Sequence, residues 1–322
     1  MRAVIVKSPG GPEMLQVAEV PDPPRRPGDL LVRVRAAGVN RADLLQRLGR
    51  YPPPPGESEI LGLEIAGEVV QTAGGFEPGD RVMALLAGGG YAELARVPPP
   101  QAMPIPDTMS FADAAAIPEA FLTAWLNLMM LGRLTRGEVV VVHAAASGVG
   151  SAALQLCRDI ASVILATASE PKHQACLELG ATHVLARDQV ASALPETVQR
   201  IAGRGADLIF DLVGGSYLEA NVAALGLQGR LCCISTMGGA KATLDMGMLL
   251  SRRLTILGST LRSRSPEQKA KLVADFRRNA LPRFVTGRLR PVVGRTIPLE
   301  RAGEAHEAMA RNEVVGKIVL VV

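Results

Sequence analysis

Aromatic residues are scarce in this chain: Phe, Trp and Tyr together make up 3% of its 322 residues, and only one of them is Trp. Hydrophobic residues nevertheless reach 48%, so Ala, Val, Leu and Gly must supply most of the interior. The chain is longer than the ~250–300 residues at which a single core stops growing. We therefore expect an ordinary globular protein of roughly two domains.

Cysteine is also rare, since the chain has four and none of them forms a Cys-x-x-Cys pair. Buried free thiols are therefore predicted for Cys157, Cys176, Cys232 and Cys233. No stretch is predicted to span a bilayer, and residues 1–7 indicate a strand in place of a signal peptide. We expect a cytoplasmic protein with no membrane partner.

No long run of one charge is present, although the net charge is +4. The Lys and Arg residues are dispersed along the chain, which gives little support for a nucleic-acid partner. A modest positive balance is compatible with an anionic small molecule.

What the chain does contain is a run of four valines, 139–142, followed by His143 and then by very small residues up to Gly150. Such a run is typical of a strand buried on both faces. Small side chains before a helix let a pyrophosphate approach the backbone N–H groups. The residues predicted to do so are Ala145, Ser147, Gly148, Val149 and Gly150.

The match of this loop to G-x-G-x-x-G is incomplete, because Ala145 and Ser147 occupy the first two glycine places and only Gly150 fits the third. A tight strand-to-helix turn that binds nothing remains the alternative. His143 beside the loop is interpreted as a neutral, structural imidazole.

The predicted pattern of secondary structure changes near residue 135. Residues 1–120 carry strand and turn signals without regular alternation, which indicates a β-rich, partly barrel-like domain. Strands and helices then alternate, as in a doubly wound parallel sheet. The predicted elements are 139–143, 151–161, 163–167, 171–179, 183–185, 190–202, 208–211, 218–225, 230–234 and 255–258.

A second change occurs at Ser265, where Ser-Pro-Glu-Gln predicts the start of a long helix. Residues 316–322 read as a strand that returns to the first domain. The predicted domains are therefore 1–120 with 266–322, and an inserted nucleotide-binding domain at 121–265.

The choice of dinucleotide depends on the end of the second strand, where an acid would bind both ribose hydroxyls of NAD. Residues 167–169 are Thr-Ala-Ser and contain no acid. Ser169, Lys172 and Arg187 could hold a 2′-phosphate, so NADPH is predicted. Glu170 argues against this choice, and solvated surface cations remain the alternative.

Several motifs resemble the medium-chain dehydrogenase/reductase superfamily: GLEIAGEV at 62–69, PGDRV at 78–82, AAIP at 115–118 and ASGVG at 146–150. Others resemble its zinc-free quinone oxidoreductases, closest to the p53-inducible, zeta-crystallin-like branch: VNRAD at 39–43, ALL at 84–86, GGG at 88–90, PEA at 118–120 and LRSR at 261–264. The resemblance covers the whole chain.

This resemblance implies a GroES-like catalytic domain beside a Rossmann domain. Zinc-dependent relatives have a cysteine where this chain has Asn40 and a histidine where it has Leu63, so no metal ligand set is expected. In the family a cleft is lined by residues matching Asn40, Tyr51 and Thr123. Of these, Asn40 and Thr123 are also expected to bind the cofactor, together with Ser235, Met237, Gly238, Leu261, Arg262 and Lys317.

The expected reaction is therefore metal-free reduction of an ortho- or para-quinone by NADPH, with Tyr51 and Asn40 as the catalytic residues. Tyr51 precedes four prolines, a stiff segment that could present its ring to a quinone. A loop tyrosine that shields apolar surface, and a turn-forming asparagine, remain the alternatives for these two residues.

Two other functions also remain open. One is an NADPH-dependent enoyl or alkenal reductase. The other is a weakly catalytic, crystallin-like nucleotide-binding protein, for which RNA is the conceivable partner. A homodimer is expected in each case, paired through residues 254–261.

We predict that the purified protein contains no stoichiometric zinc and keeps its activity in a chelator, because Asn40 and Leu63 stand where two ligands are needed. Elemental analysis measures this directly. One tightly bound zinc per chain would contradict the zinc-free assignment.

Overall fold

The computed structural model describes residues 1–24 and 26–322. It divides into two compact units, the first formed by Met1–Leu122 together with Leu261–Val322 and the second by Thr123–Thr260. The second unit is thus inserted in the sequence of the first.

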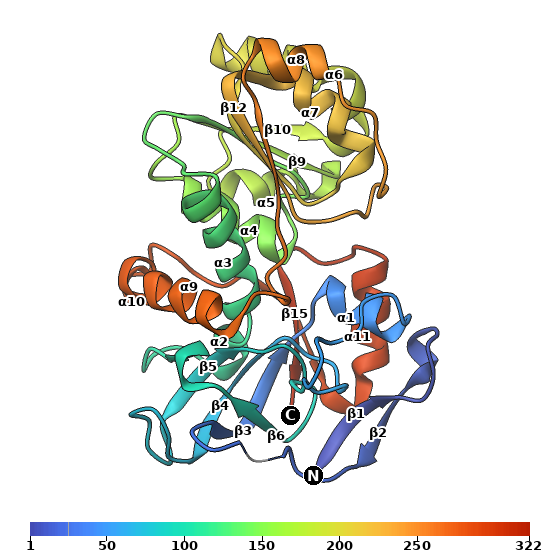
Figure 1. Cartoon of the computed structure of the whole chain (residues 1–322), viewed down its shortest axis with the longest axis vertical. Helices are drawn as coiled ribbons and strands as arrows, with labels where there is room; N and C mark the ends of the chain where they lie inside the picture. The colour runs from blue at the N-terminus through green and yellow to red at the C-terminus, as the bar shows by residue number, and fades with distance from the viewer. Residues whose placement is uncertain (25) are drawn as a thin grey trace. The chain divides into compact units, whose positions relative to one another are not determined.

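The first unit is built on a seven-stranded sheet in the order β14-β15-β3-β4-β5-β7, with β6 paired to β3, and on a separate β1-β2 hairpin. Figure 1 shows the late strand β15 in red in the same sheet as the early strand β3 in blue. The strands are β1 (Arg2–Val6), β2 (Leu15–Glu19), β3 (Leu30–Gly38), β4 (Glu64–Gln71), β5 (Arg81–Leu85), β6 (Leu94–Val97), β7 (Ala102–Pro104), β14 (Val293–Pro298) and β15 (Lys317–Val321).

Helices of the first unit are α1 (Arg41–Arg47), α2 (Phe111–Ala114), α9 (Pro266–Asn279), α10 (Leu281–Val285) and α11 (Ala302–Ala310). The predicted capping box of α9 is present, since the Ser265 hydroxyl accepts from the Gln268 N–H and the Gln268 side chain accepts from the Ser265 N–H. The predicted return of the C-terminal strand is also confirmed, because β15 pairs antiparallel with β3.

The second unit contains a six-stranded, wholly parallel sheet in the order β10-β9-β8-β11-β12-β13. This confirms the predicted parallel α/β architecture. The strands are β8 (Val139–Val142), β9 (Val163–Ala168), β10 (His183–Ala186), β11 (Ala206–Asp211), β12 (Leu225–Cys233) and β13 (Thr255–Gly258). The helices are α4 (Gly148–Cys157), α5 (His173–Glu178), α6 (Val190–Ala202), α7 (Leu218–Ala224) and α8 (Met246–Ser251).

Three predicted details are wrong. The first helix of this unit begins at Gly148, three residues before the predicted start, because Ser147 caps it, and it ends at Cys157. Strand β12 begins at Leu225 instead of residue 230. Cys233 is only partly buried, whereas the other three cysteines are buried and all four are free.

Helix α3 (Pro118–Trp125) continues into a π-helix at Leu126–Leu131 and crosses the boundary between the two units. Together with α2 it forms the segment Phe111–Leu131, which among the described residues is long and apolar enough to cross a membrane by length and composition. The expectation that no stretch spans a bilayer stays a prediction. Burial covers 78% of its apolar window, as in the core helix of a folded protein.

The packing of α4 against the β8 loop predicts that Gly150→Ala is destabilising. A Cβ at Gly150 would lie 2.4 Å from the Ala144 carbonyl oxygen and 2.6 Å from the Ala145 Cα, so backbone must move, at a cost of about 1–3 kcal/mol. Gly258→Ala is the matched control, because its Cβ meets nothing within 4 Å. Chemical denaturation measures both, and equal stability of the two variants would contradict this packing.

Candidate functional site

The six parallel strands of the second unit all end at one edge of the sheet, which is where open α/β sheets bind ligands. The segments that follow four of these strands carry most of the predicted cofactor residues. The loop between β8 and α4 follows the first of these strands, and Ser169 follows β9. Arg187 follows β10, and β12 is followed by Ser235, Met237 and Gly238.

The loop between β8 and α4 is closely packed. The Ser147 hydroxyl accepts the Gly150 N–H at 3.1 Å and caps the helix, while Ala145 donates its N–H to the Thr167 carbonyl at 3.0 Å. Gly148 and Val149 occupy the first turn, where backbone N–H groups lack partners within the helix. A ten-residue helix with such a start suits a phosphate group.

Ser169 and Arg187 are brought side by side by the sheet. The parallel register pairs Ala168 with Ala186, which are the last residues of β9 and β10. Ser169 and Arg187 come directly after them and therefore lie at the same edge of the sheet. The Arg187 charge contributes to a lowered pKa of Lys172, after the larger effect of burial. Two cations are therefore close to one another here, as expected of a site for an anion.

The residues after β12 are held mainly through their backbone. The Gly238 N–H donates to the Val213 carbonyl at 2.7 Å, and the Ser235 hydroxyl accepts the Met237 N–H at 3.2 Å. Met237 is exposed. Thr123, the first residue of this unit, is buried in α3, and its carbonyl accepts from Asn127.

His143 lies completely buried behind the loop. Its Nε2 lies 2.7 Å from the Asn221 Oδ1, so Nε2 carries the proton and Nδ1 accepts from the Thr167 hydroxyl at 3.0 Å. Asn221 in turn donates to Asp211 at 3.1 Å. Burial lowers the pKa of His143, so the imidazole is neutral and structural.

In the first unit, a buried cluster surrounds Asn40. The Lys317 ammonium donates to the carbonyl of Val39 at 2.8 Å and to the Asn40 Oδ1 at 2.6 Å, and it forms an ion pair with the Glu64 Oε1 at 2.6 Å. Asn40 donates to the same Glu64 oxygen at 3.0 Å and to the Gly38 carbonyl at 3.3 Å. All three Lys317 donors and both Asn40 amide hydrogens therefore have partners within the protein.

A second buried chain of hydrogen bonds starts at Arg47 and ends at Asp43. Arg47 can only donate, so the His306 Nδ1 accepts from it at 3.3 Å and the His306 Nε2 carries the proton. That Nε2 lies 3.3 Å from the Tyr91 hydroxyl, which donates to Asp43 at 3.0 Å. Asp43 also accepts the Asn40 N–H at 2.8 Å. The chain thus ties α11 to the loop that carries Asn40.

Burial sets the protonation of this chain. It lowers the pKa of His306 to about 3 and raises the pKa of Asp43 to about 6, although the bonds to Asn40 and Tyr91 and the charge of Lys317 partly offset the rise. At neutral pH the imidazole is uncharged and Asp43 is mostly ionised, which matches the direction of the hydrogen bonds.

The Tyr51 side chain is half-buried, and its ring packs against the Arg262 guanidinium. The Arg262 guanidinium sits 5.3 Å from the centre of the Tyr51 ring and donates to the Tyr51 carbonyl at 3.2 Å. It also donates to the Ala87 carbonyl and to the Gln46 Oε1, each at 2.7 Å. Arg262 thus fixes the Tyr51 loop from within the protein, and Leu261 beside it is buried.

Sequence reasoning missed Glu119. Its N–H donates to the Glu64 Oε2 at 2.8 Å, while its own Oε2 is buried and has no hydrogen-bond partner. Burial, followed by the Glu64 charge, raises the pKa of Glu119 to about 8. A signal was present, because Glu119 is the one charged residue between Ala114 and Leu131.

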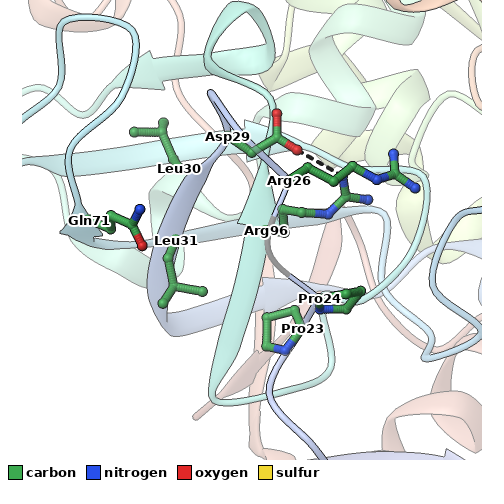
Figure 2. Close-up of a pocket in the computed structure, with 8 residues that line it drawn as sticks. All are labelled: Pro23, Pro24, Arg26, Asp29, Leu30, Leu31, Gln71 and Arg96. Atoms are coloured by element: carbon green, nitrogen blue, oxygen red, sulfur yellow. Dashed lines mark hydrogen bonds and ion pairs between the residues drawn. The ribbon is translucent and has the colours of Figure 1, made fainter.

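Other places where a ligand could bind lie outside the predicted site residues. The larger of two surface pockets in the first unit, of about 440 Å³, is lined by the N-terminal residues Met1 and Arg2 and by part of β3. Across residues 1–24 and 26–322 no group of three or more His, Cys, Asp and Glu side chains could hold a metal ion. A small surface pocket beside β3 has room for about one water, and its charged pair Asp29 and Arg96 is bridged at 2.7 Å (Figure 2). It lies apart from every predicted site residue.

Comparisons with known proteins agree with this architecture. Residues 26–107 match the alcohol dehydrogenase GroES-like domain, and residues 148–277 match the zinc-binding dehydrogenase family model. The human synaptic vesicle membrane protein VAT-1 homolog is 31% identical over 344 aligned residues, covering 100% of this chain and 86% of that protein.

Two solved structures are similar over 100% of both chains. A crystal structure of an NAD-dependent alcohol dehydrogenase has 33% identity and a TM-score of 0.87. The quinone oxidoreductase from Thermus thermophilus, solved alone and with NADPH, has 34% identity and a TM-score of 0.83. With both domain models and the full length matched, the chain belongs to the medium-chain dehydrogenase/reductase superfamily of oxidoreductases.

Proposed function

We propose that this protein reduces quinones with NADPH and without a metal. The observation that carries the cofactor choice is the group of Ser169, Lys172 and Arg187 at the ends of β9 and β10, with no acid among residues 167–169. Two neighbouring cations favour a 2′-phosphate over the neutral ribose of NAD. The relatives include one protein described with NADPH and one described with NAD. The positive charge of Lys172 and Arg187 is therefore what favours NADPH over NAD in this protein.

The pyrophosphate is assigned to the first turn of α4. The N–H groups of Gly148 and Val149 lie in that turn, where they lack partners within the helix and can bind an anion. Gly150 leaves no room for a side chain between the helix and the loop, which suits the close helix–strand packing of such a site. Nucleotide binding thereby falls to the second unit, with Ser235, Met237 and Gly238 after β12 as further lining. The cofactor supplies a hydride when bound.

The first unit is assigned the substrate. Tyr51 presents an aromatic ring that Arg262 holds in place, and a flat quinone ring can stack against it. Lys317 and Glu64 hold Asn40 in place. Its Oδ1 accepts one bond from Lys317, and the second lone pair of this oxygen can accept a hydrogen bond from the ligand. Lys317 acts through Asn40 and does not bind the cofactor directly, because its three donors are occupied.

A quinone suits these residues because it needs no Lewis acid. Its reduction creates an aromatic ring, so holding it in line with the hydride donor can supply much of the rate. An activated C=C bond has the same electronic demand, which keeps the enoyl or alkenal reductase as the second candidate. For assembly, we propose pairing through β13, the outermost strand of its sheet.

The cofactor assignment is tested by Lys172→Glu. The new carboxylate should weaken NADPH binding by about 10-fold or more through loss of a charge-assisted bond and added repulsion, and should change NADH binding by less than about 2-fold. Lys271→Glu, an exposed site on α9, makes the same charge change elsewhere. Fluorescence titration of both cofactors against each protein measures this, and unchanged NADPH affinity in Lys172→Glu would remove Lys172 from the site.

The substrate assignment is tested by Tyr51→Ala beside Tyr51→Phe. Loss of the ring should lower kcat/KM for flat quinones by about 3- to 10-fold, the value of one aromatic stacking contact, with NADPH affinity nearly unchanged. The Phe variant keeps the ring and should retain most of this activity. If Tyr51→Ala reduces quinones as fast as the parent, the substrate lies elsewhere.

A further inference from the structure

We propose that the Glu119 carboxyl group donates the proton that completes quinone reduction. This inference rests on the proposed function, and it adds to that function the source of the proton.

The first observation is the unpartnered oxygen. Glu119 lies in the first turn of α3, its Oε2 is buried, and no protein group donates to it or accepts from it. A buried polar atom without a partner is uncommon in folded proteins and often marks a place where a ligand or a transferable proton belongs.

The second observation is the contrast with Glu64. Glu64 receives Lys317 at 2.6 Å, Asn40 at 3.0 Å and the Glu119 N–H at 2.8 Å, so its negative charge is well compensated. Among the described residues, the Glu119 side chain forms no ion pair, and its Oε2 has no hydrogen-bond partner. Two adjacent carboxyl groups whose surroundings differ in this way can take different roles, and Glu119 is the one without a compensating cation.

The charges around Glu119 explain why it keeps that proton. Glu64 on β4 and Asp43 on α1 raise its pKa, while Lys317 on β15 and Lys269 on α9 lower it by less than burial raises it. Lys317 is also engaged by Glu64. Glu119 is therefore an uncharged acid at neutral pH.

The third observation is the neighbourhood of the predicted stacking ring. Tyr51 and Arg262, the residue that holds the Tyr51 loop, both lie close enough to the Glu119 carboxyl group for its ionisation to affect their pKa values. A quinone stacked on Tyr51 would thus lie within the surroundings of this acid. Both residues belong to the first unit.

The step balances. Hydride addition to the quinone gives a hydroquinone monoanion, and the Glu119 O–H then gives its proton to the anionic oxygen. Glu119 becomes a carboxylate and regains its proton from water. An acid with a pKa of about 8 can protonate a hydroquinone oxygen, whose pKa resembles the ~10 of a tyrosine phenol.

The experiment compares wild type, Glu119→Gln and the control Glu219→Gln. Glu219 is an exposed glutamate in the first turn of α7, so its replacement makes the same Glu-to-Gln change at the same helical position, away from the proposed site. Steady-state NADPH oxidation is measured from about pH 6 to pH 9 with quinones whose hydroquinones differ in acidity. The pH dependence of unfolding is measured in parallel.

In wild type and in Glu219→Gln, kcat should fall above a pH of about 8, as Glu119 loses its proton. Glu119→Gln should lose this fall and should lower kcat by roughly 10²-fold for the least acidic hydroquinones, with a smaller defect for the more acidic ones. KM should change by less than about 2-fold. A purely structural role would not make the defect depend on hydroquinone acidity.

Unfolding provides a readout independent of turnover. The folded-state pKa of Glu119 is raised from 4.5 to about 8, so the folded protein holds one more proton between these values and wild type should lose stability as the pH rises through them. Glu119→Gln should lack this part of the loss. Glu119→Ala with added formate is a second variant, in which formate should restore turnover.

The outcomes separate the two proposals. No NADPH oxidation by wild type with any quinone would overturn the proposed function and this inference together. Normal turnover by wild type with an unchanged pH profile in Glu119→Gln would overturn the proton donor alone. Equal pH dependence of stability in wild type and Glu119→Gln would also overturn it, because Glu119 would then carry no proton to give.

Discussion

The ion pair between Lys317 and Glu64 is the contact on which the first unit depends. Its two charges are almost completely buried and lie 2.6 Å apart, and Asn40 bonds to both of them. Removing either partner would leave an uncompensated buried charge, which typically costs 3–5 kcal/mol. The same contact joins β15 to β4 and fixes the start of α1, so the fold and the candidate substrate site share one set of bonds.

The second unit uses a different constraint. Its six strands are parallel, so their carboxyl ends gather the β8 loop, Ser169 and Arg187 at one edge without any buried ion pair. Gly150 lets α4 pack directly on the β8 loop, because a side chain there would meet the backbone of Ala144 and Ala145. In the first unit, by contrast, a buried ion pair holds three segments of the chain together.

Much of this arrangement could be predicted from the sequence because it is local. Four consecutive valines specify β8, and the Ser265 capping box specifies the start of α9. The parallel sheet followed from alternation alone. The ends of elements were harder to predict. The start of α4 depends on the Ser147 side chain accepting one N–H group, and amino-acid composition placed this start three residues too late.

Less of the candidate site could be predicted from the sequence, for a physical reason. Lys317 and Asn40 are 277 residues apart in the chain, and nothing in local spacing says that every donor of Lys317 is used inside the protein. Burial and the nearby Glu64 raise the pKa of Glu119, so that it keeps its proton, and neither cause is visible in its immediate sequence neighbours. The separation of Lys317 from Asn40 also orders folding: during synthesis the inserted 123–260 unit can fold as a contiguous segment, while Glu64 must wait for β15 to supply its countercharge.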